Sequence, residues 1–576
     1  MTTGSVLMAL GASTLTYAAN PEQSGLDAGT LQQQIDKEVP DVFTRALPSP
    51  GAPSDQDLQL DQGVQVLVKA VRLEGVHLVD EHELQDKLAA SLGKAYSLQQ
   101  LQTLVDIVTA FYSERGLVVQ AYLPAQTIQE DGVVVIQVLE AKLGAVTVDN
   151  IKQEARLSNE KAARYVTEQL AVGQPLNATA VSKGLALLNE LPGIKAQMAL
   201  EAGDKDGETN VHLDIKRTSL FDARIETKNA GSRSTGVSQA AISASLNGPA
   251  KVGDQAAFYG LFSQGSSFNQ IAYSLPIGYR GLRLGMTANY LEYENIGSYK
   301  TNGGYGHAST LGTNISYPLK RSQSTNVNLF AAYDYKSYTN RNMATDTINS
   351  RYDIQDVSVG FNANHYDGFL GGGLTTLTSN IVFGHFHVNA DTPSTFLVGE
   401  DGRRYVPSDF QKITVNASRI QALPLDGTQL NINVSGQVSD DNLNSAEQFY
   451  LGGPYGVRAY PVAQGNGSQG MLASFELQKR LPYNLTGIAF FDAGTVQQYK
   501  EQGIYRELKG NTDASNSYEL YGAGFGLKWN SGHWNLSSVV AWKVGSNPLK
   551  TGAGLSVDND GTDTSPRAWF NGSYSF

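Results

Sequence analysis

The chain has 576 residues, no cysteine, 59 glycines and 28 tyrosines, and its formal net charge is −12. Its length exceeds one ordinary domain, so at least two folding units are expected. The lack of cysteine excludes disulfides and cysteine-ligated metals. An acidic chain without clustered Lys and Arg is not expected to bind nucleic acid.

The first residues, "MTTGSVLMALGASTLTYAAN", carry an apolar stretch followed by small residues. This pattern is typical of a secretory signal that ends near Ala18 or Ala19, so residues 1–19 are assigned to it. The basic residues that usually open such a signal are absent, which makes a non-native start the alternative. No later stretch has 18 consecutive apolar residues, and a membrane-spanning helix is therefore excluded. An exported chain of this kind is either free in the periplasm or a barrel.

Residues 27–39, "DAGTLQQQIDKEV", predict a short helix with one narrow apolar stripe, formed by Leu31, Ile35 and Val39. Pro40 should end the helix. The stretch from Pro40 to residue 63 has four prolines and no hydrophobic period, which is typical of an extended linker. We therefore expect a tethered helical region at 20–40 and a linker at 41–63.

Two similar units are predicted next, at 64–142 and 143–217, each with the order strand, helix, helix, strand, strand. Ser97 and Gln100 form a capping box at the second helix of the first unit. The buried face of that helix is predicted to be Leu101, Leu104, Val105, Val108 and Phe111. The elements are expected at 64–74, 80–90, 97–116, 118–122 and 132–140, and again at 145–150, 159–170, 177–191, 194–201 and 209–216. A repeat of about 75 residues supports the two units together.

From Phe221 onward the helical period gives way to about sixteen segments of roughly ten residues that alternate apolar and polar side chains. The segments at 326–336, 429–438 and 471–480 show this alternation clearly. Short connections such as "PIGYRG", "LKRSQS", "LDGT" and "LPYN" alternate with long polar runs at 338–353 and 387–409. These features predict an outer-membrane β-barrel of about sixteen antiparallel strands over 218–576, with its last strand ending at Phe576.

A large soluble β protein is the alternative to the barrel. A propeller would need a blade repeat of about 40 residues or more, and a β-helix would need short-period repeats. This half of the sequence has neither pattern, which favours the barrel.

Motifs for chemistry are sparse. No glycine-rich phosphate loop ends in Gly-Lys-Ser/Thr, and "GNGSQG" at 465–470 lacks the glycine that a nucleophile elbow has two residues before Ser468. His385 and His387 share one side of a strand, but no third ligand is evident, so they are interpreted as polar strand residues rather than a metal site. We predict no enzyme activity, no metal and no cofactor.

The stretch "LGGPYGVRAYP" at 451–461 presents Val457, Arg458 and Tyr460 in a glycine-rich loop. The surrounding aromatics, Phe449, Tyr450, Tyr455 and Tyr460, favour burial of this loop inside the barrel. A buried arginine requires an anion. Asp492 is the candidate, because alternation along 485–493 places it on the face that avoids lipid. The sequence predicts an Arg458–Asp492 pair, with a solvent-exposed outer loop as the alternative.

The order helix, linker, two βααββ units and barrel resembles the TpsB transporters of two-partner secretion, within the larger superfamily of barrels that carry POTRA domains. "VRAY" resembles the family's VRG(Y/F) signature, and "FFDAG", with Phe490, Asp492 and Gly494, resembles its F-x-D-x-G strand motif. "NAGSRSTG" at 229–236 and "LPG" at 191–193 also match. Ala459 departs from the signature glycine, and its methyl group could forbid a positive φ at this position.

The resemblance implies two periplasmic POTRA domains, a helix that plugs the pore, and a monomer among outer-membrane lipids. It implies export of a large unfolded exoprotein, the TpsA partner, recognised through its N-terminal secretion domain and moved without ATP. The partner's type stays open among adhesin, haemolysin or other cytolysin, and contact-dependent toxin. A barrel-assembly factor would share the fold but normally has more POTRA units. A general porin needs no such units, and a barrel-anchored enzyme lacks a site.

Overall fold

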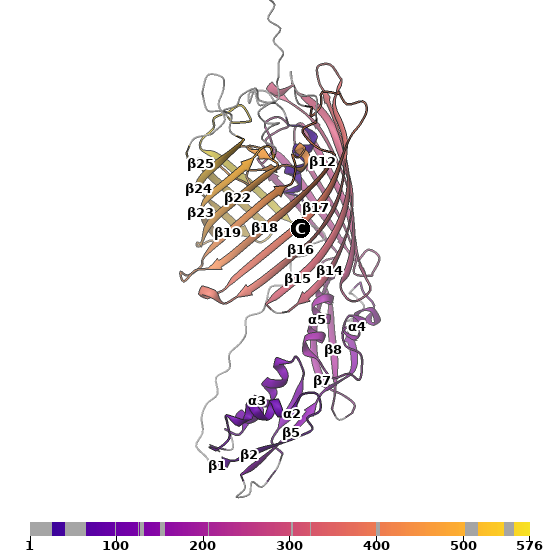
Figure 1. Cartoon of the computed structure of the whole chain (residues 1–576), viewed down its shortest axis with the longest axis vertical. Helices are drawn as coiled ribbons and strands as arrows, with labels where there is room; N and C mark the ends of the chain where they lie inside the picture. Colours follow the sequence, from indigo (N-terminus) through magenta and orange to yellow (C-terminus); the bar gives the residue numbers. More distant parts are fainter. Residues whose placement is uncertain are drawn as a thin grey trace, which may run out of the picture.

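The computed structural model describes residues 26–40, 65–97, 100–124, 126, 132–149, 156–205, 207–300, 303–322, 324–398, 404–500, 516–545 and 558–576. The predicted signal at 1–19 and the linker at 41–63 lie outside the described residues. Figure 1 shows two small α+β units in line below a large barrel, and helix α1 (Ala28–Asp36) inside the barrel. None of the described helices is long and apolar enough to span a membrane.

The first α+β unit departs from its predicted order in two places. The expected strand at 64–74 is two strands in different sheets, which Lys69 separates, and a further strand pairs with the first of them. The reciprocal hydrogen bonds of the predicted capping box are present, since Gln100 Oε1 accepts from Ser97 N (2.8 Å) and Ser97 Oγ accepts from Gln100 N (3.1 Å). The helix itself begins only at Gln102, after Leu101, so the prediction that it opens at Ser97 is wrong. The elements are β1 (Gln65–Val68), β2 (Ala70–Glu74), α2 (Glu81–Ala89), β3 (Lys94–Ser97), α3 (Gln102–Glu114), β4 (Val119–Tyr122) and β5 (Val133–Glu140).

The second α+β unit has the predicted order of one strand, two helices and two strands. Its sheet has the order β6-β8-β7, and α4 and α5 pack closely at Gly184, where a Cβ atom would lie 2.7 Å from the Tyr165 carbonyl oxygen. The elements are β6 (Lys142–Asp149), α4 (Asn159–Thr167), α5 (Ala178–Asn189), β7 (Ile194–Ala202) and β8 (Glu208–Arg217). This unit buries its own apolar core between the helices and the sheet.

The second unit contacts one end of the barrel, which we call the proximal end; the opposite end is the distal end. Glu190 accepts from Arg321 Nε at 2.5 Å, and Arg156 Nε donates to the carbonyl of Gly248 at 2.6 Å. The ring of Tyr165 meets that of Tyr279 edge-on, with centroids 5.3 Å apart. Polar and aromatic contacts therefore hold this unit against the barrel turns.

The barrel is closed by sixteen antiparallel strands, which agrees with the predicted architecture. The last strand pairs with the first through the register Asn571↔Lys228 to Ser575↔Arg224. The strands are β9 (Phe221–Lys228), β10 (Gln239–Asn247), β11 (Gln255–Phe262), β12 (Ser266–Ile277), β13 (Leu282–Glu294), β14 (Gly304–Arg321), β15 (Thr325–Asn342), β16 (Ile348–Asp367), β17 (Gly373–Val388), β18 (Asp409–Ala422), β19 (Thr428–Ser439), β22 (Gln469–Arg480), β23 (Leu485–Gln497), β24 (Ser517–Ser531), β25 (Trp534–Lys543) and β26 (Arg567–Ser575).

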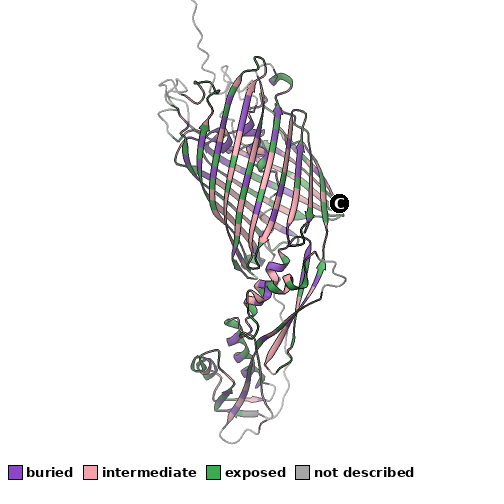
Figure 2. Cartoon of the chain, turned by 90° about the vertical axis from the view of Figure 1, so that its right-hand side faces the viewer, coloured by how far each residue is buried: buried purple, intermediate pink, exposed green. Residues whose placement is uncertain are grey.

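Exposure alternates along the barrel strands, as the burial colours of Figure 2 show. Apolar side chains such as Leu329 (43% exposed) and Val359 (53%) cover the outer face. One predicted loop is wrong: most of 338–353 is strand, because β15 runs to Asn342 and β16 begins at Ile348. The inward residues Tyr338 and Tyr352 are buried against α1. Because this inward packing stabilises the strands, they continue through 338–353 even though their outward residues are polar.

Candidate functional site

The loop between β19 and β22, residues 440–468, folds back into the barrel, and we call it the latch loop. Val457, Ala459 and Tyr460 are fully buried, and Arg458 is 8% exposed. The three apolar residues form one cluster with inward side chains of the neighbouring strands, including Leu472, Ile488, Phe490, Leu520 and Ala541. The alternative of a solvent-exposed loop therefore does not hold.

The predicted pair of Arg458 and Asp492 is present. Asp492, which is fully buried, accepts from Arg458 Nε at 2.9 Å and Nη2 at 2.8 Å, and also from the Arg458 backbone N at 3.1 Å. The guanidinium lies 3.5 Å above the centre of the Phe490 ring. Charge, planar geometry and a cation–π contact thus act on the same side chain.

Three further partners of Arg458 were missed in the sequence. Glu476 Oε2 accepts from Nη1 at 2.8 Å, and Ser474 Oγ accepts from Nη2 at 3.1 Å. The indole of Trp569 donates to the Arg458 carbonyl at 2.7 Å. Alternation already places Ser474 and Glu476 on the polar face of their segment. Finding them also required the strand register, which sets Ser474 opposite Asp492.

The one departure from the family signature, Ala459, has a local explanation. Ala459 does not adopt a positive φ, so its methyl group causes no backbone strain. That methyl lies against Gly522, where an added Cβ would come within 2.8 Å of it. Gly494 similarly leaves space for Leu451, because a Cβ there would lie 2.7 Å from Leu451 Cδ2. The predicted burial of Tyr455 is wrong, since it is 48% exposed.

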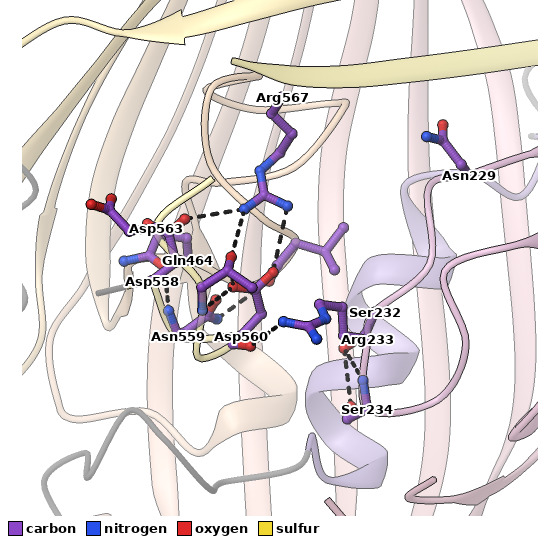
Figure 3. A network of polar contacts seen from close by, with 12 residues as sticks. Asn229, Ser232, Arg233, Ser234, Gln464, Asp558, Asn559, Asp560, Asp563 and Arg567 are labelled. Atoms are coloured by element: carbon purple, nitrogen blue, oxygen red, sulfur yellow. Dashed lines mark hydrogen bonds and ion pairs between the residues drawn. The ribbon is translucent and has the colours of Figure 1, made fainter. Parts of the chain in front are cut away.

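A second polar network fixes the latch loop at the distal end (Figure 3). Asn559 donates from its backbone N to Gln464 Oε1 (2.8 Å). The neighbouring Asp558, fully buried, pairs with Lys543 (2.9 Å) and Arg567 (3.1 Å). On the other side, Arg233 from the β9–β10 loop donates to the Asp560 carbonyl at 3.2 Å. The latch loop is thus joined to the last and first strands of the barrel. The other hairpin residues drawn there, Asn229, Ser232 and Ser234, belong to the same β9–β10 loop.

The plug helix is α1, and it ends three residues earlier than predicted. Leu31 and Ile35 are 4% exposed and pack in one cluster with Tyr338, Tyr352 and Phe386 on the inner face of the barrel. Val39 lies beyond the helix end yet packs against the same cluster. The early end has a physical reason, since Pro40 disfavours helical conformation in the residue before it.

The plug helix rests on the base of the latch loop, which includes the short helix η4 (Ser445–Glu447). Ser445 Oγ donates to Asp27 Oδ2 at 2.7 Å, and Gln33 Nε2 donates to the Ala446 carbonyl. Gly29 permits this approach, because a Cβ there would lie 2.9 Å from Ala446 Cβ. The loop that carries Arg458 at its tip therefore contacts the plug helix at its base.

Glu447 anchors that base. It is 1% exposed, and its two oxygens meet Lys336 Nζ at 2.7 Å and Lys412 Nζ at 2.6 Å. Burial alone would raise the pKa of Glu447, but the charges of Lys336 and Lys412 lower it to about 2. The carboxylate therefore stays ionised and holds the loop to β15 and β18.

His385 and His387 lie on the outward side of β17, apart from the latch loop. Both are exposed, and His385 Nδ1 lies 2.7 Å from Asp409 Oδ1.

Comparison with known proteins gives the family. Residues 207–529 match the family described as haemolysin secretion/activation protein ShlB/FhaC/HecB, and residues 66–141 match the ShlB-type POTRA domain. The chain belongs to the ShlB/FhaC/HecB family. It is thus a TpsB-type transporter of the bacterial outer membrane, with POTRA domains on the periplasmic, proximal side.

Relatives of known name agree with this assignment. The heme/hemopexin transporter protein HuxB of Haemophilus influenzae is 27% identical over 541 residues, covering 92% of each chain. The outer membrane transporter CdiB of Dickeya dadantii is 24% identical and covers 84% of each chain. The solved structure of CdiB from Escherichia coli has the same fold, with a TM-score of 0.67 at 22% identity over 96% of this chain and 99% of that one.

Arg458→Ala should release the latch loop while the barrel stays intact, because removing one partner of a desolvated ion pair costs about 3–5 kcal/mol. The chain has no cysteine, so a single Val457→Cys reports on the loop. We expect this buried thiol to be protected from a membrane-impermeant maleimide on intact cells, and to react quickly once Arg458 is removed.

Arg341→Ala is the matched control. The Arg341–Asp346 pair is exposed, with 33% and 69% of the side chains accessible, so its loss should cost less than about 1 kcal/mol. Continued protection of Val457→Cys in the Arg458→Ala protein would show that the pair does not hold the loop.

Proposed function

We propose that this transporter recognises a large unfolded exoprotein in the periplasm and passes it through the barrel to the cell surface. The arrangement that carries the proposal is a closed barrel whose interior holds a separate helix: α1 is seated on a loop that ion pairs fix to the wall. A pore that must stay closed at rest and open for a polymer needs an element that can leave, and we propose that α1 is this element. Folding of the emerging chain outside, rather than ATP, drives the movement.

The carried protein is a TpsA partner of the adhesin, haemolysin or contact-dependent toxin type, and the transporter acts as a monomer without cofactor. We expect the gene beside this one to encode that TpsA partner. An outer-membrane assembly factor or a porin would not depend on such a partner.

Secretion should depend on the latch. When the chain is co-expressed with the neighbouring exoprotein, Arg458→Ala and Asp492→Ala should each reduce the exoprotein in the medium sharply, since the first leaves the buried Asp492 without its cation and the second leaves Arg458 with Glu476 alone. The barrel should still be inserted and should resist unfolding in detergent before heating. Arg341→Ala should secrete normally. Normal secretion by both latch variants would exclude a role for the pair in transport.

The plug should control conductance. Deleting residues 20–60 removes α1, so the single-channel conductance in planar bilayers should rise markedly. Glu447→Ala should raise it in the full-length chain too, because the seat of α1 loses the anion between Lys336 and Lys412. Glu292→Ala, which alters an exposed carboxylate on the outer face, should leave conductance unchanged. If the deletion also conducts as before, α1 does not plug the pore.

We further propose that the POTRA units bind the partner's N-terminal secretion domain in an unfolded state. The sheet of each unit has an edge strand, β4 in the first and β7 in the second, to which an extended chain can add. In the second sheet, α4 packs along the opposite edge strand, β6. Leu200 is 46% exposed on β7 and offers apolar contact to such a strand.

Leu200→Asp should weaken binding of the unfolded secretion domain to the full-length protein about tenfold, because it removes the burial of one leucine. Val172→Asp is the control, since Val172 is also exposed (58%) but lies in a turn. Titration in detergent micelles measures both. Binding of folded secretion domain alone would place recognition elsewhere.

A further inference from the structure

The apolar outer face of the barrel has a hollow at its first strands. It spans β9 to β14 and has a volume of about 490 Å³. Large side chains at its edge are exposed, as Ile271 (62%) and Met286 (49%) show. Their outward direction follows from alternation along the strands. Tyr259 and Phe268, on the other face of β11 and β12, belong to the cluster that packs around α1.

Three outward alanines, each beside a large side chain of a neighbouring strand, produce the hollow. They are Ala244 beside Phe258, Ala256 between Leu246 and Tyr273, and Ala288 between Ile271 and Leu311. A methyl group at these positions leaves space that the longer neighbours do not fill. Atoms beside such a space lose van der Waals contacts, so an apolar molecule that fits between the large side chains is favoured there.

The hollow lies at the proximal end of the apolar face. The β10–β11 turn, residues 248–254, begins two residues after Leu246 and ends two residues before Ala256. About 7 Å of strand therefore separates the hollow from the turn. Tyr273, which lines the hollow, donates from its hydroxyl to Asp254 Oδ2 in this turn at 2.7 Å. Tyrosine is enriched at the level of lipid head groups. The molecules available to the hollow are therefore the acyl chains of the periplasmic leaflet.

The same turn presents a lysine at the level of the head groups. Lys251 is exposed, and its φ of 60° lies in the left-handed region that favours glycine. Asp254, which is fully buried, supports this conformation by accepting from Ala250 N at 2.9 Å. The second POTRA unit holds the turn from its other side, because Arg156 Nη2 donates to the Pro249 carbonyl at 3.1 Å. Both domains thus fix the backbone of Lys251, and its exposed ammonium group can meet an anion.

We propose that the hollow binds an acyl chain of an anionic phospholipid of the periplasmic leaflet, with the lipid phosphate at Lys251. This ligand site goes beyond the proposed transport function. Acyl chains are as apolar as the barrel surface, so the hollow contributes packing rather than a hydrophobic driving force. Charge supplies the selectivity, because a lysine at the membrane surface attracts an anionic head group more strongly than a zwitterionic one.

The test uses the full-length protein in phosphatidylethanolamine vesicles that contain a small fraction of a phospholipid with a photoactivatable acyl chain. This probe has either a phosphatidylglycerol or a phosphatidylethanolamine head group. After illumination, mass spectrometry measures the labelling of peptides that contain Phe258 and Ile271. Peptides that contain Phe491, which is exposed on the outer face of β23, correct for the amount of each probe at the barrel surface.

We expect the corrected labelling at the hollow to be about fivefold higher with the phosphatidylglycerol probe, the ratio that one lysine near the surface supports. Lys251→Gln should remove this preference, whereas Lys479→Gln, which changes an exposed lysine at the proximal end of β22, should keep it. Ala244→Trp should fill the hollow and lower its labelling to that of the reference peptides. Ala417→Trp, which changes a half-buried alanine on the outer face of β18, should not.

Equal corrected labelling by the two probes would overturn the proposal, as would a preference that survives Lys251→Gln or Ala244→Trp. Each variant is first tested for resistance to unfolding before heating, which shows that its barrel is intact. Secretion does not enter the measurement, so its result is independent of the proposed transport function.

Discussion

A buried guanidinium with its matched carboxylates is the interaction on which the interior of this barrel depends. Arg458 reaches Asp492 and Glu476 on two neighbouring strands, and it can be buried only because both anions are present. At the other end of the same loop the signs are reversed, with one carboxylate, Glu447, between two lysines. The loop is thus held at tip and base by charges that water cannot easily replace, and α1 takes its position from the base.

The latch loop and the segment after the plug helix also contact the two strands that close the barrel. β26 and β9 share a register of five residue pairs, and above it the side chain of Asn229 continues the ladder by donating to the Ala568 carbonyl and accepting from Phe570 N. The Trp569 indole joins β26 to the latch arginine, while Lys228 on β9 pairs with Glu38 beyond the plug helix at 2.5 Å. Latch and plug therefore each contact one of the two closing strands.

Much of this arrangement can be predicted from the sequence, because it follows from a period of two. Alternation gave the strands, the inward direction of Asp492 and, with the need of a buried arginine for an anion, the pair with Arg458. Glu476 and Trp569 could not be identified in this way, since their contacts depend on which strands are neighbours and in what register. The loop expected at 338–353 was wrong for a related reason. Hydropathy assumes lipid outside, whereas distal strand ends can be polar outside and apolar inside when they pack on α1.

The latch loop is held to the wall more firmly than α1 is held to the loop. A fixed loop needs ions, because only a desolvated pair resists displacement by several kcal/mol, and the ion pairs of Arg458 lie where the latch loop packs on β22 to β24. The contacts described above between α1 and the base of this loop are hydrogen bonds, from Ser445 to Asp27 and from Gln33 to the Ala446 carbonyl. A hydrogen bond exchanged with water contributes less than a desolvated ion pair. A chain that passes through the barrel would therefore displace α1 before it displaced the loop whose tip carries Arg458.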